Sequence, residues 1–167
     1  VGVFGTGKIG QMGIKNLSGF GCRILAYDKF PNEEAKKYAT YVDGPTFARE
    51  SDIITLHCPL TPETRHILNE ETLPYLKDGV FIINTSRGAL LDTAKMIQFL
   101  KSGKIGYLAI DVYEEEADYF YSDLSDKVPT NYELARLLTF PNVLVTSHMA
   151  FLTDHALRNI AETTLGN

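Results

Sequence analysis

Short apolar runs alternate with helix-like stretches along almost the whole chain. The runs are rich in valine and isoleucine and apolar nearly throughout, which is typical of strands covered on both faces. Six segments are expected as strands: 1–4, 23–27, 52–57, 80–84, 107–112 and 143–146. Helical patterns lie between them, for example over 7–20, 92–101 and 133–138. Strands joined by crossover helices predict a parallel, doubly wound α/β sheet.

A glycine pattern after the first apolar run points to a ligand. Gly5-Thr6-Gly7-Lys8-Ile9-Gly10 fits G-x-G-x-x-G, with a strand pattern before it and a helical pattern after it. In a Rossmann-type fold, Gly5 permits the tight turn, Gly7 lets the backbone approach a pyrophosphate, and Gly10 allows close packing of helix and strand. Lys8 and Ile9 belong to the same turn, and the free N–H groups at the helix start favour the phosphates. The pattern predicts dinucleotide binding.

An acid selects between the two nicotinamide dinucleotides. Asp28 ends the second strand pattern, 18 residues after Gly10. Its carboxylate can accept hydrogen bonds from ribose hydroxyls and repels a 2′-phosphate, which favours NAD over NADP. Lys29 beside it would offset part of that repulsion.

Composition limits the other partners. The 167 residues are 44% apolar and 22% charged, which suits one globular core. A net charge of −5 gives no electrostatic case for nucleic acid or an anionic membrane. No apolar run reaches the roughly 18 residues of a membrane span. We expect neither partner.

The two cysteines and the first residue of the chain bear on the cellular compartment of the protein. Cys22 and Cys58 lie in apolar segments, which predicts buried, reduced thiols and a reducing compartment, the cytoplasm. Val1 already belongs to the first strand pattern, so the chain looks like part of a longer protein. Any organellar targeting segment would lie upstream of it.

Three side chains suited to binding a carboxylate and transferring a proton follow separate strand patterns. Arg87 follows 80–84, Glu116 follows 107–112, and His148 follows 143–146. Ligands bind at the carboxyl ends of strands in such sheets. An arginine can bind a carboxylate through two N–H groups, a histidine can transfer a proton near neutral pH, and a carboxylate can orient that histidine.

Other residues compete for these roles. Glu114 and Glu115 precede Glu116, and an acidic run is usually just solvated. His57 is expected in a structural or near-cofactor position, whereas His66 and His155 lie in helical stretches and are expected to be exposed. A metal site built from His57, Cys58 and His66 lacks the spaced ligand pairs of zinc sites, so no metal is expected.

The chain as a whole resembles the D-isomer-specific 2-hydroxy acid dehydrogenase family. The matching stretches are GTGKIG, DIITLHCPLTPETRHILN, GVFIINTSRGALLD, LAIDVYEEE and NVLVTSHMAFLT. The resemblance implies an NAD-dependent oxidoreductase that transfers a hydride between the nicotinamide and a small 2-oxo or 2-hydroxy acid. It assigns Arg87 to the substrate carboxylate and reacting carbonyl, His148 to proton donation during reduction, and Glu116 to stabilising protonated His148.

The same resemblance carries over further contacts with NAD. They are Cys58 and Pro59 beside the adenine and ribose, Thr64, Thr85 and Ser86 next to the arginine, and Asp111 near the nicotinamide carboxamide.

Two features resemble the D-lactate branch of the family, and they favour reduction of pyruvate to D-lactate. One is an aromatic insert at 119–123, and the other is the Phe151 segment directly after His148. Alternatives stay open: a sister activity on glyoxylate, hydroxypyruvate, a branched 2-oxo acid or 3-phosphoglycerate, or an NAD-sensing transcriptional corepressor of the same fold. These relatives can retain the same arginine, glutamate and histidine.

The resemblance also implies a two-domain protein. Residues 1–151 are expected to form the NAD-binding domain, and 152–167 a helix that leads back toward a smaller substrate domain absent from this chain. Members of the family dimerise through the cofactor domain, so a homodimer is expected. Because domain closure excludes water from hydride transfer, we expect the 167 residues alone to bind NAD weakly and not to turn over lactate at a useful rate.

Overall fold

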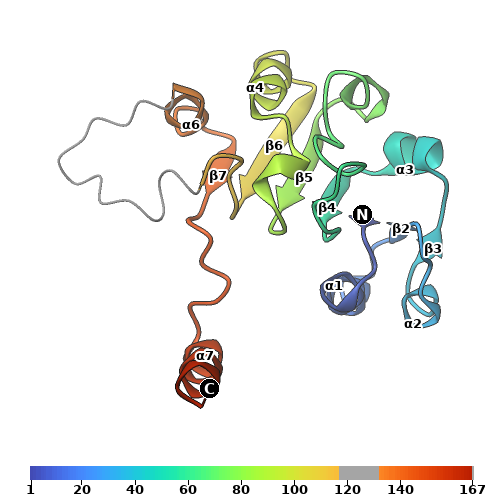
Figure 1. The fold of residues 1–167 in the computed structure, drawn as a ribbon. Coiled ribbons are helices and arrows are strands. Elements are labelled where there is room, and N and C mark those ends of the chain that lie inside the picture. The colour runs from blue at the N-terminus through green and yellow to red at the C-terminus, as the bar shows by residue number, and fades with distance from the viewer. Residues whose placement is uncertain (117–131, 167) are drawn as a thin grey trace.

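The computed structural model describes residues 1–116 and 132–166. Within these residues seven parallel strands form one sheet, in the order β3-β2-β1-β4-β5-β6-β7 (Figure 1). The strands are β1 (Gly2–Phe4), β2 (Leu25–Tyr27), β3 (Thr40–Tyr41), β4 (Ile53–Leu56), β5 (Val80–Asn84), β6 (Ile105–Ile110) and β7 (Val143–Val145). The chain runs outward from β1 to one edge and then from β4 to the other. This order confirms the predicted doubly wound, Rossmann-type fold.

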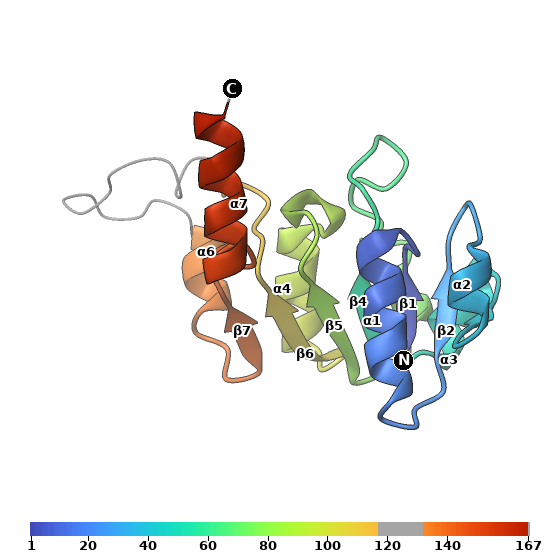
Figure 2. The same cartoon turned by 90° about the horizontal axis from the view of Figure 1, so that it is seen from below.

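Helices lie on both sides of the sheet (Figure 1). On one side are α1 (Lys8–Ser18) and α2 (Glu33–Lys36), and on the other α3 (Gly44–Glu50), α4 (Thr93–Lys101) and α6 (Tyr132–Leu137). Two short 3-10 helices, η1 (Leu73–Tyr75) and η2 (Gly88–Leu90), lie in the connections. The last helix, α7 (Asp154–Leu165), stands apart from the sheet, and none of its described residues is buried (Figures 1 and 2).

Polar caps determine where several helices begin. The Asp92 carboxylate accepts a hydrogen bond from the Lys95 amide at 3.1 Å and so starts α4, within the helix predicted over 92–101. Thr153 caps α7 in the same way through the amide of Ala156. Such caps satisfy amides of the first turn that have no acceptor within the helix.

The hydrophobic pattern did not predict β3. This strand has only two residues, one of them polar, and it pairs with β2 alone at the edge of the sheet. A segment this short carries no periodicity, so its structure depends on the neighbouring strand. The helix α3 was also not predicted, although Asp43 caps it and Pro45 lies in its first turn.

The core has two parts, one on each side of the sheet. The larger part lies under α3, α4 and α6, and the smaller one, which includes Val3 and Ile14, lies under α1 and α2. The expected coverage on both faces holds for the central strands but is wrong for β5 to β7. There Phe81, Tyr107 and Leu144 are exposed, because α4 and α6 cover the opposite face (Figure 1).

The cysteines fit their expected environment only in part. Cys58 is buried and Cys22 is half-buried in the loop before β2, and both are free thiols. No helix in the described ranges has the length and apolarity needed to cross a membrane.

Candidate active site

The glycine turn between β1 and α1 has a conformation that depends on its glycines. Gly5 has φ +94°, and a Cβ there would lie 2.5 Å from the amide nitrogen of Cys58. A Cβ at Gly10 would lie 2.0 Å from the Gly5 carbonyl oxygen. At Gly7, in contrast, a Cβ would meet nothing described within 4 Å. The turn is therefore packed on its inner side and open where a pyrophosphate would approach.

The start of α1 is suited to an anion. Gly7 caps the helix without a side chain, and the first bond to it runs from the Gln11 amide to the Gly7 carbonyl at 2.9 Å. The three preceding amides, from Lys8 to Gly10, have no acceptor within the helix. Their N–H groups and the helix dipole favour a bound phosphate. The residues present thus fit a dinucleotide pyrophosphate.

Asp28 lies beside this turn, at the end of β2. One carboxylate oxygen accepts hydrogen bonds from the amide and the hydroxyl of Thr6, the latter at 3.0 Å. The other oxygen accepts a bond from the Phe30 amide at 2.8 Å. Tyr41 from β3 donates its hydroxyl proton to the Thr6 hydroxyl at 2.7 Å. The negative charge of Asp28 is thus held next to the phosphate turn, while the Lys29 ammonium lies over the Phe30 ring.

The loop after β4 passes beside the glycine turn and is tied to the loop after β5. Ser86 donates its hydroxyl to the carbonyl of Cys58 at 2.7 Å, and Thr64 donates its hydroxyl to the carbonyl of Pro59 at 2.7 Å. Burial raises the pKa of the Cys58 thiol to about 11, so this residue offers backbone groups rather than a thiolate. Thr85 is exposed at the end of β5.

His57 packs beneath α1. Its Nε2 lies 3.0 Å from the Thr55 hydroxyl and would lie 3.6 Å from a Cβ at Gly13. Burial lowers its pKa, because desolvation disfavours the imidazolium form. The ring is thus a neutral packing group near the phosphate turn.

Glu116 and His148 come together from the loops that follow β6 and β7. Nδ1 of His148 lies 3.1 Å from a carboxylate oxygen of Glu116. The His148 side chain is 40% exposed and that of Glu116 is 21% exposed, so solvent or a ligand can reach the pair. The second oxygen of Glu116 accepts a bond from the Tyr113 amide at 3.2 Å. A carboxylate on Nδ1 leaves Nε2 for proton transfer.

Asp111 holds the backbone around His148, which has φ +52°. The Asp111 carbonyl accepts a bond from the His148 amide at 2.6 Å, and its carboxylate accepts bonds from the Thr146 hydroxyl at 2.5 Å and the Met149 amide at 3.0 Å. Burial by itself raises the pKa of Asp111, but these hydrogen bonds outweigh burial and lower it overall. Asp111 is therefore an ionised anchor for the His148 segment.

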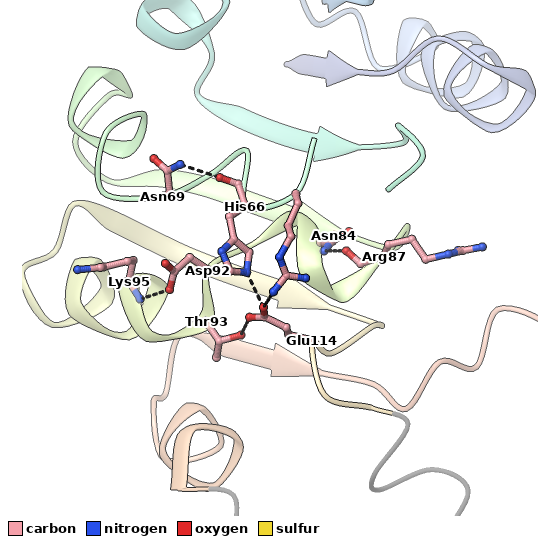
Figure 3. Close-up of polar contacts among 9 residues, drawn as sticks. His66, Asn69, Asn84, Arg87, Asp92, Thr93, Lys95 and Glu114 are labelled. Carbon is pink, nitrogen blue, oxygen red and sulfur yellow. Dashed lines mark hydrogen bonds and ion pairs between the residues drawn. The ribbon is translucent and has the colours of Figure 1, made fainter. Parts of the chain in front are cut away.

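Arg87 follows β5 and extends away from the loop contacts around Glu114 (Figure 3). Its guanidinium donates to the carbonyl of Ser86 at 2.7 Å, and it forms no ion pair with any described residue. The backbone beside it is tightly fixed: a Cβ at Gly88 would lie 2.1 Å from the Tyr113 carbonyl oxygen. The loops that carry Arg87 and Glu116 therefore touch main chain to main chain.

One prediction about a competing histidine is wrong. His66 was expected to be helical and exposed, but it lies in a turn with φ +51° and is half-buried. Its Nε2 contacts a carboxylate oxygen of Glu114 (Figure 3). That contact joins residues 48 positions apart, which no local pattern reveals. His155 is exposed on α7, as expected.

Thr6 and Thr146 were also not singled out from the sequence. Thr6 is buried inside the glycine motif, and Thr146 lies two residues before His148. Neither had a distinguishing signal in the sequence, because a threonine beside a strand is common.

Three further expectations concern the aromatic insert, Phe151 and a metal site. The aromatic insert at 119–123 lies outside the described residues. Phe151 is half exposed, three residues after His148. Among the described residues, no group of three or more histidine, cysteine, aspartate or glutamate side chains could hold a metal ion.

Comparison with known proteins places this geometry in context. Residues 1–150 match the family model "D-isomer specific 2-hydroxyacid dehydrogenase, NAD binding domain". The chain is 52% identical to "D-lactate dehydrogenase" of Escherichia coli over 99% of this chain and 51% of that protein. It is 51% identical to "2-hydroxyacid dehydrogenase A" of Aspergillus oryzae over 100% of this chain and 48% of that protein. The chain thus spans about half the length of the curated relatives it matches.

A solved structure shares the fold closely. The crystal structure of D-lactate dehydrogenase with NAD+ from Lactobacillus jensenii superposes with a TM-score of 0.90 at 35% identity. The match covers 98% of this chain and 49% of that one.

Proposed function

Given that the chain belongs to the D-isomer specific 2-hydroxyacid dehydrogenase family, as its NAD-binding domain, we propose that it carries the cofactor site and the catalytic side chains of an NAD-dependent D-lactate dehydrogenase. The observation that supports this most is the pair formed by His148 and Glu116, 3.1 Å apart. This pair follows strands of the same parallel sheet whose β1 leads into the glycine turn. Carboxyl ends of such strands lie along one edge, where ligands bind.

The cofactor site is proposed from the residues around the phosphate turn. Amides of Lys8, Ile9 and Gly10 bind the pyrophosphate, while Gly5 and Gly7 shape the turn. Asp28 accepts hydrogen bonds from the adenosine ribose and disfavours NADP. The loop residues Cys58, Pro59, Thr64, Thr85, Ser86 and Asp111 complete the contacts. These assignments agree with the open space at Gly7 and the fixed carboxylate of Asp28.

The substrate chemistry is proposed from three side chains. When bound, NADH supplies a hydride to C2 of the 2-oxo acid. Arg87 binds the substrate carboxylate through two parallel N–H groups and polarises the carbonyl. His148 donates its Nε2 proton to the carbonyl oxygen, which becomes the hydroxyl. Glu116 holds the Nδ1 proton throughout and stabilises the imidazolium form before the transfer.

The rest of the protein supplies the remainder of the site in this proposal. Residues 1–151 form the NAD-binding domain, and 152–167 lead toward a smaller domain that covers the substrate. The exposed α7, with no buried residue in its described range, supports a further packing partner for it. Closure of the two domains would exclude water from the reaction.

The experiment is a substrate panel on the complete protein that carries this chain. Pyruvate, glyoxylate, hydroxypyruvate, a branched 2-oxo acid and 3-phosphohydroxypyruvate are compared by NADH oxidation, and product chirality is read on a chiral column. We expect the highest kcat/KM with pyruvate and a D-lactate product. A preference for another 2-oxo acid would reassign the substrate. An absence of turnover on every acid of the panel would reject the proposed dehydrogenase activity.

We further propose a homodimer in the cytoplasm. The two free cysteines, neither in a disulfide, support a reducing compartment. The family resemblance supports association through the cofactor domain. Sedimentation equilibrium of the complete protein would test the dimer, and a monomer at micromolar concentration would reject it.

A further inference from the structure

A second histidine–glutamate pair lies next to the one proposed for catalysis. Nε2 of His66 contacts one carboxylate oxygen of Glu114 (Figure 3). Nη2 of Arg65 lies 3.1 Å from the same oxygen. The hydroxyl of Thr93 donates to the other oxygen at 3.4 Å. Glu114 is 19% exposed and His66 is 29% exposed. The carboxylate is therefore surrounded by donors from the loop after β4 and from the first residue of α4.

These contacts join segments that follow three neighbouring strands, and one of these segments is the start of α4. Arg65 and His66 follow β4, Thr93 follows β5, and Glu114 follows β6. The backbone reinforces the junction, because the His66 amide donates to the Ala89 carbonyl at 2.8 Å. Glu114 is thus a common acceptor for two segments that lie far from it in the sequence.

The junction lies directly beside the proposed catalytic groups. Glu114 precedes Glu116 by two residues in one turn, in which the Glu116 amide donates to the Tyr113 carbonyl at 3.3 Å. Gly88, which directly follows Arg87 in the segment after β5, lies against the backbone of Tyr113. A shift of Glu114 would therefore be expected to move the adjacent Tyr113 main chain, whose amide binds the Glu116 carboxylate.

The charge around Glu114 favours a fixed position. Burial raises the pKa of Glu133, and the nearby carboxylates of Glu115 and Glu114 raise it further. In this acidic surrounding, the guanidinium of Arg65 supplies a compensating positive charge at Glu114. Opposite charges at this distance hold a half-buried carboxylate in place more firmly than neutral donors do.

We propose that Arg65, His66 and Glu114 are positioning residues, which set the location of the Glu116 carboxylate against His148 and so act on proton transfer without contacting the substrate. This inference rests on the proposed function, because Glu114 would act by positioning Glu116, a residue that the proposed function places in catalysis. It differs from a role in catalysis itself, since the His66 ring is held by Glu114 and not by the substrate site.

The test compares Glu114→Gln with a matched control in the complete protein. Glu70→Gln is the control, because it removes the same charge from an ion pair with Lys95 near the same loops. We expect Glu114→Gln to lower kcat about 10- to 100-fold, with the Kd for NADH changed less than about 2-fold, as for a misplaced catalytic group. Equal kcat values for the two variants would overturn the proposal.

A double-mutant cycle separates positioning from general damage. If Glu114 acts through Glu116, then Glu114→Gln has little further effect on kcat in a Glu116→Gln background. Fully multiplicative losses would overturn the proposal. Arg65→Gln, at a more exposed side chain, serves as a milder variant should Glu114→Gln fold poorly, and the same cycle applies to it.

A spectroscopic readout keeps the result independent of turnover. In cofactor-free protein labelled at histidine with ¹³C, we expect Glu114→Gln to shift the ring resonances of His148 at pH 7, and Glu70→Gln to leave them in place. Unchanged His148 resonances in Glu114→Gln would reject the positioning role. Wild-type protein inactive on every 2-oxo acid, yet with the expected resonance shift, would reject the proposed function alone.

Discussion

The two histidine–glutamate pairs have the same chemistry but different surroundings. Both histidines have positive φ, +51° at His66 and +52° at His148, and their partners are two residues apart in one turn. Glu114 is held by Arg65 and Thr93 as well as by His66, whereas the Glu116 carboxylate has a backbone amide and His148. His148 is also more exposed, at 40% against 29% for His66. Under the proposed function, the surrounding donors, more than the pair itself, therefore separate a structural contact from a catalytic one.

The largest expected difference between the pairs is in turnover. His148→Gln removes the proposed proton donor, so kcat on pyruvate should fall by about 1,000-fold, within the usual range for a general acid. His66→Gln should cost only about 10-fold, because it loosens the support and leaves the donor in place. Steady-state kinetics of the complete protein measure both, and NADH titration controls for cofactor binding. Equal losses would erase the distinction.

The second difference concerns the two arginines beside these pairs. Arg87→Lys should lower kcat/KM for pyruvate about 100-fold, because an ammonium cannot form the two parallel bonds of a guanidinium to a carboxylate. Arg65→Lys should change it less than about 3-fold, since Arg65 uses a single contact with Glu114 that a lysine can replace. A larger effect at Arg65 than at Arg87 would contradict the assignment of Arg87 to the substrate.

Substitution should lower folding stability more at the His66 pair than at the His148 pair, the reverse of the order expected for turnover. His66→Ala removes a charged hydrogen bond that joins two loops, and should lower the free energy of unfolding by about 1–3 kcal/mol. His148→Ala should change it by about 0.5 kcal/mol or less, as expected of a half-exposed side chain outside the core. Urea unfolding at pH 7 measures both values. If His148→Ala proves the more destabilising, the His148 segment has a structural role not described above.

The smallest expected effect is on the stability of the protein at low pH, and it tests the support of the His148 segment by Asp111. The pKa of Asp111 is below its ordinary value of 3.8 in the folded protein. Its contribution to stability is therefore present above that ordinary value and lost as the pH falls through the lowered pKa. Asp111→Asn should flatten the fall of Tm between pH 5 and pH 3. A wild-type fall no steeper than that of the variant would show that Asp111 is not the responsible anchor.

Much of the fold was predictable because its signals are local. The glycine turn, the acid after β2 and the cap of α4 each depend on residues close in sequence. The parallel, doubly wound character of the sheet followed from strands joined by crossover helices. The two-residue β3 was not predictable, because its strand conformation comes from pairing with β2. Exposure of Phe81, Tyr107 and Leu144 was also hidden, since an apolar strand pattern does not say which face a helix covers.

The residues of the candidate site likewise include some that local sequence signals predicted and some that they did not. Arg87, Glu116 and His148 were placed by their positions after strands and by family motifs. The partnership of His66 and Glu114 depends on two loops meeting in space, and His66 lies in a stretch that looks helical from its sequence. Thr6 and Thr146 were overlooked because a threonine beside a strand is common and only its bonds to Asp28 and Asp111 distinguish it.

The contact at Gly88 has a practical consequence for protein engineering. With main chain against main chain, no side chain can be trimmed or enlarged there to tune the distance between the arginine loop and the glutamate turn. Position 88 is thus a fixed point for anyone who redesigns the two segments that meet there. Phe151, half exposed and three residues after His148, lies outside this contact, so a library of side chains at that position would leave that distance unchanged.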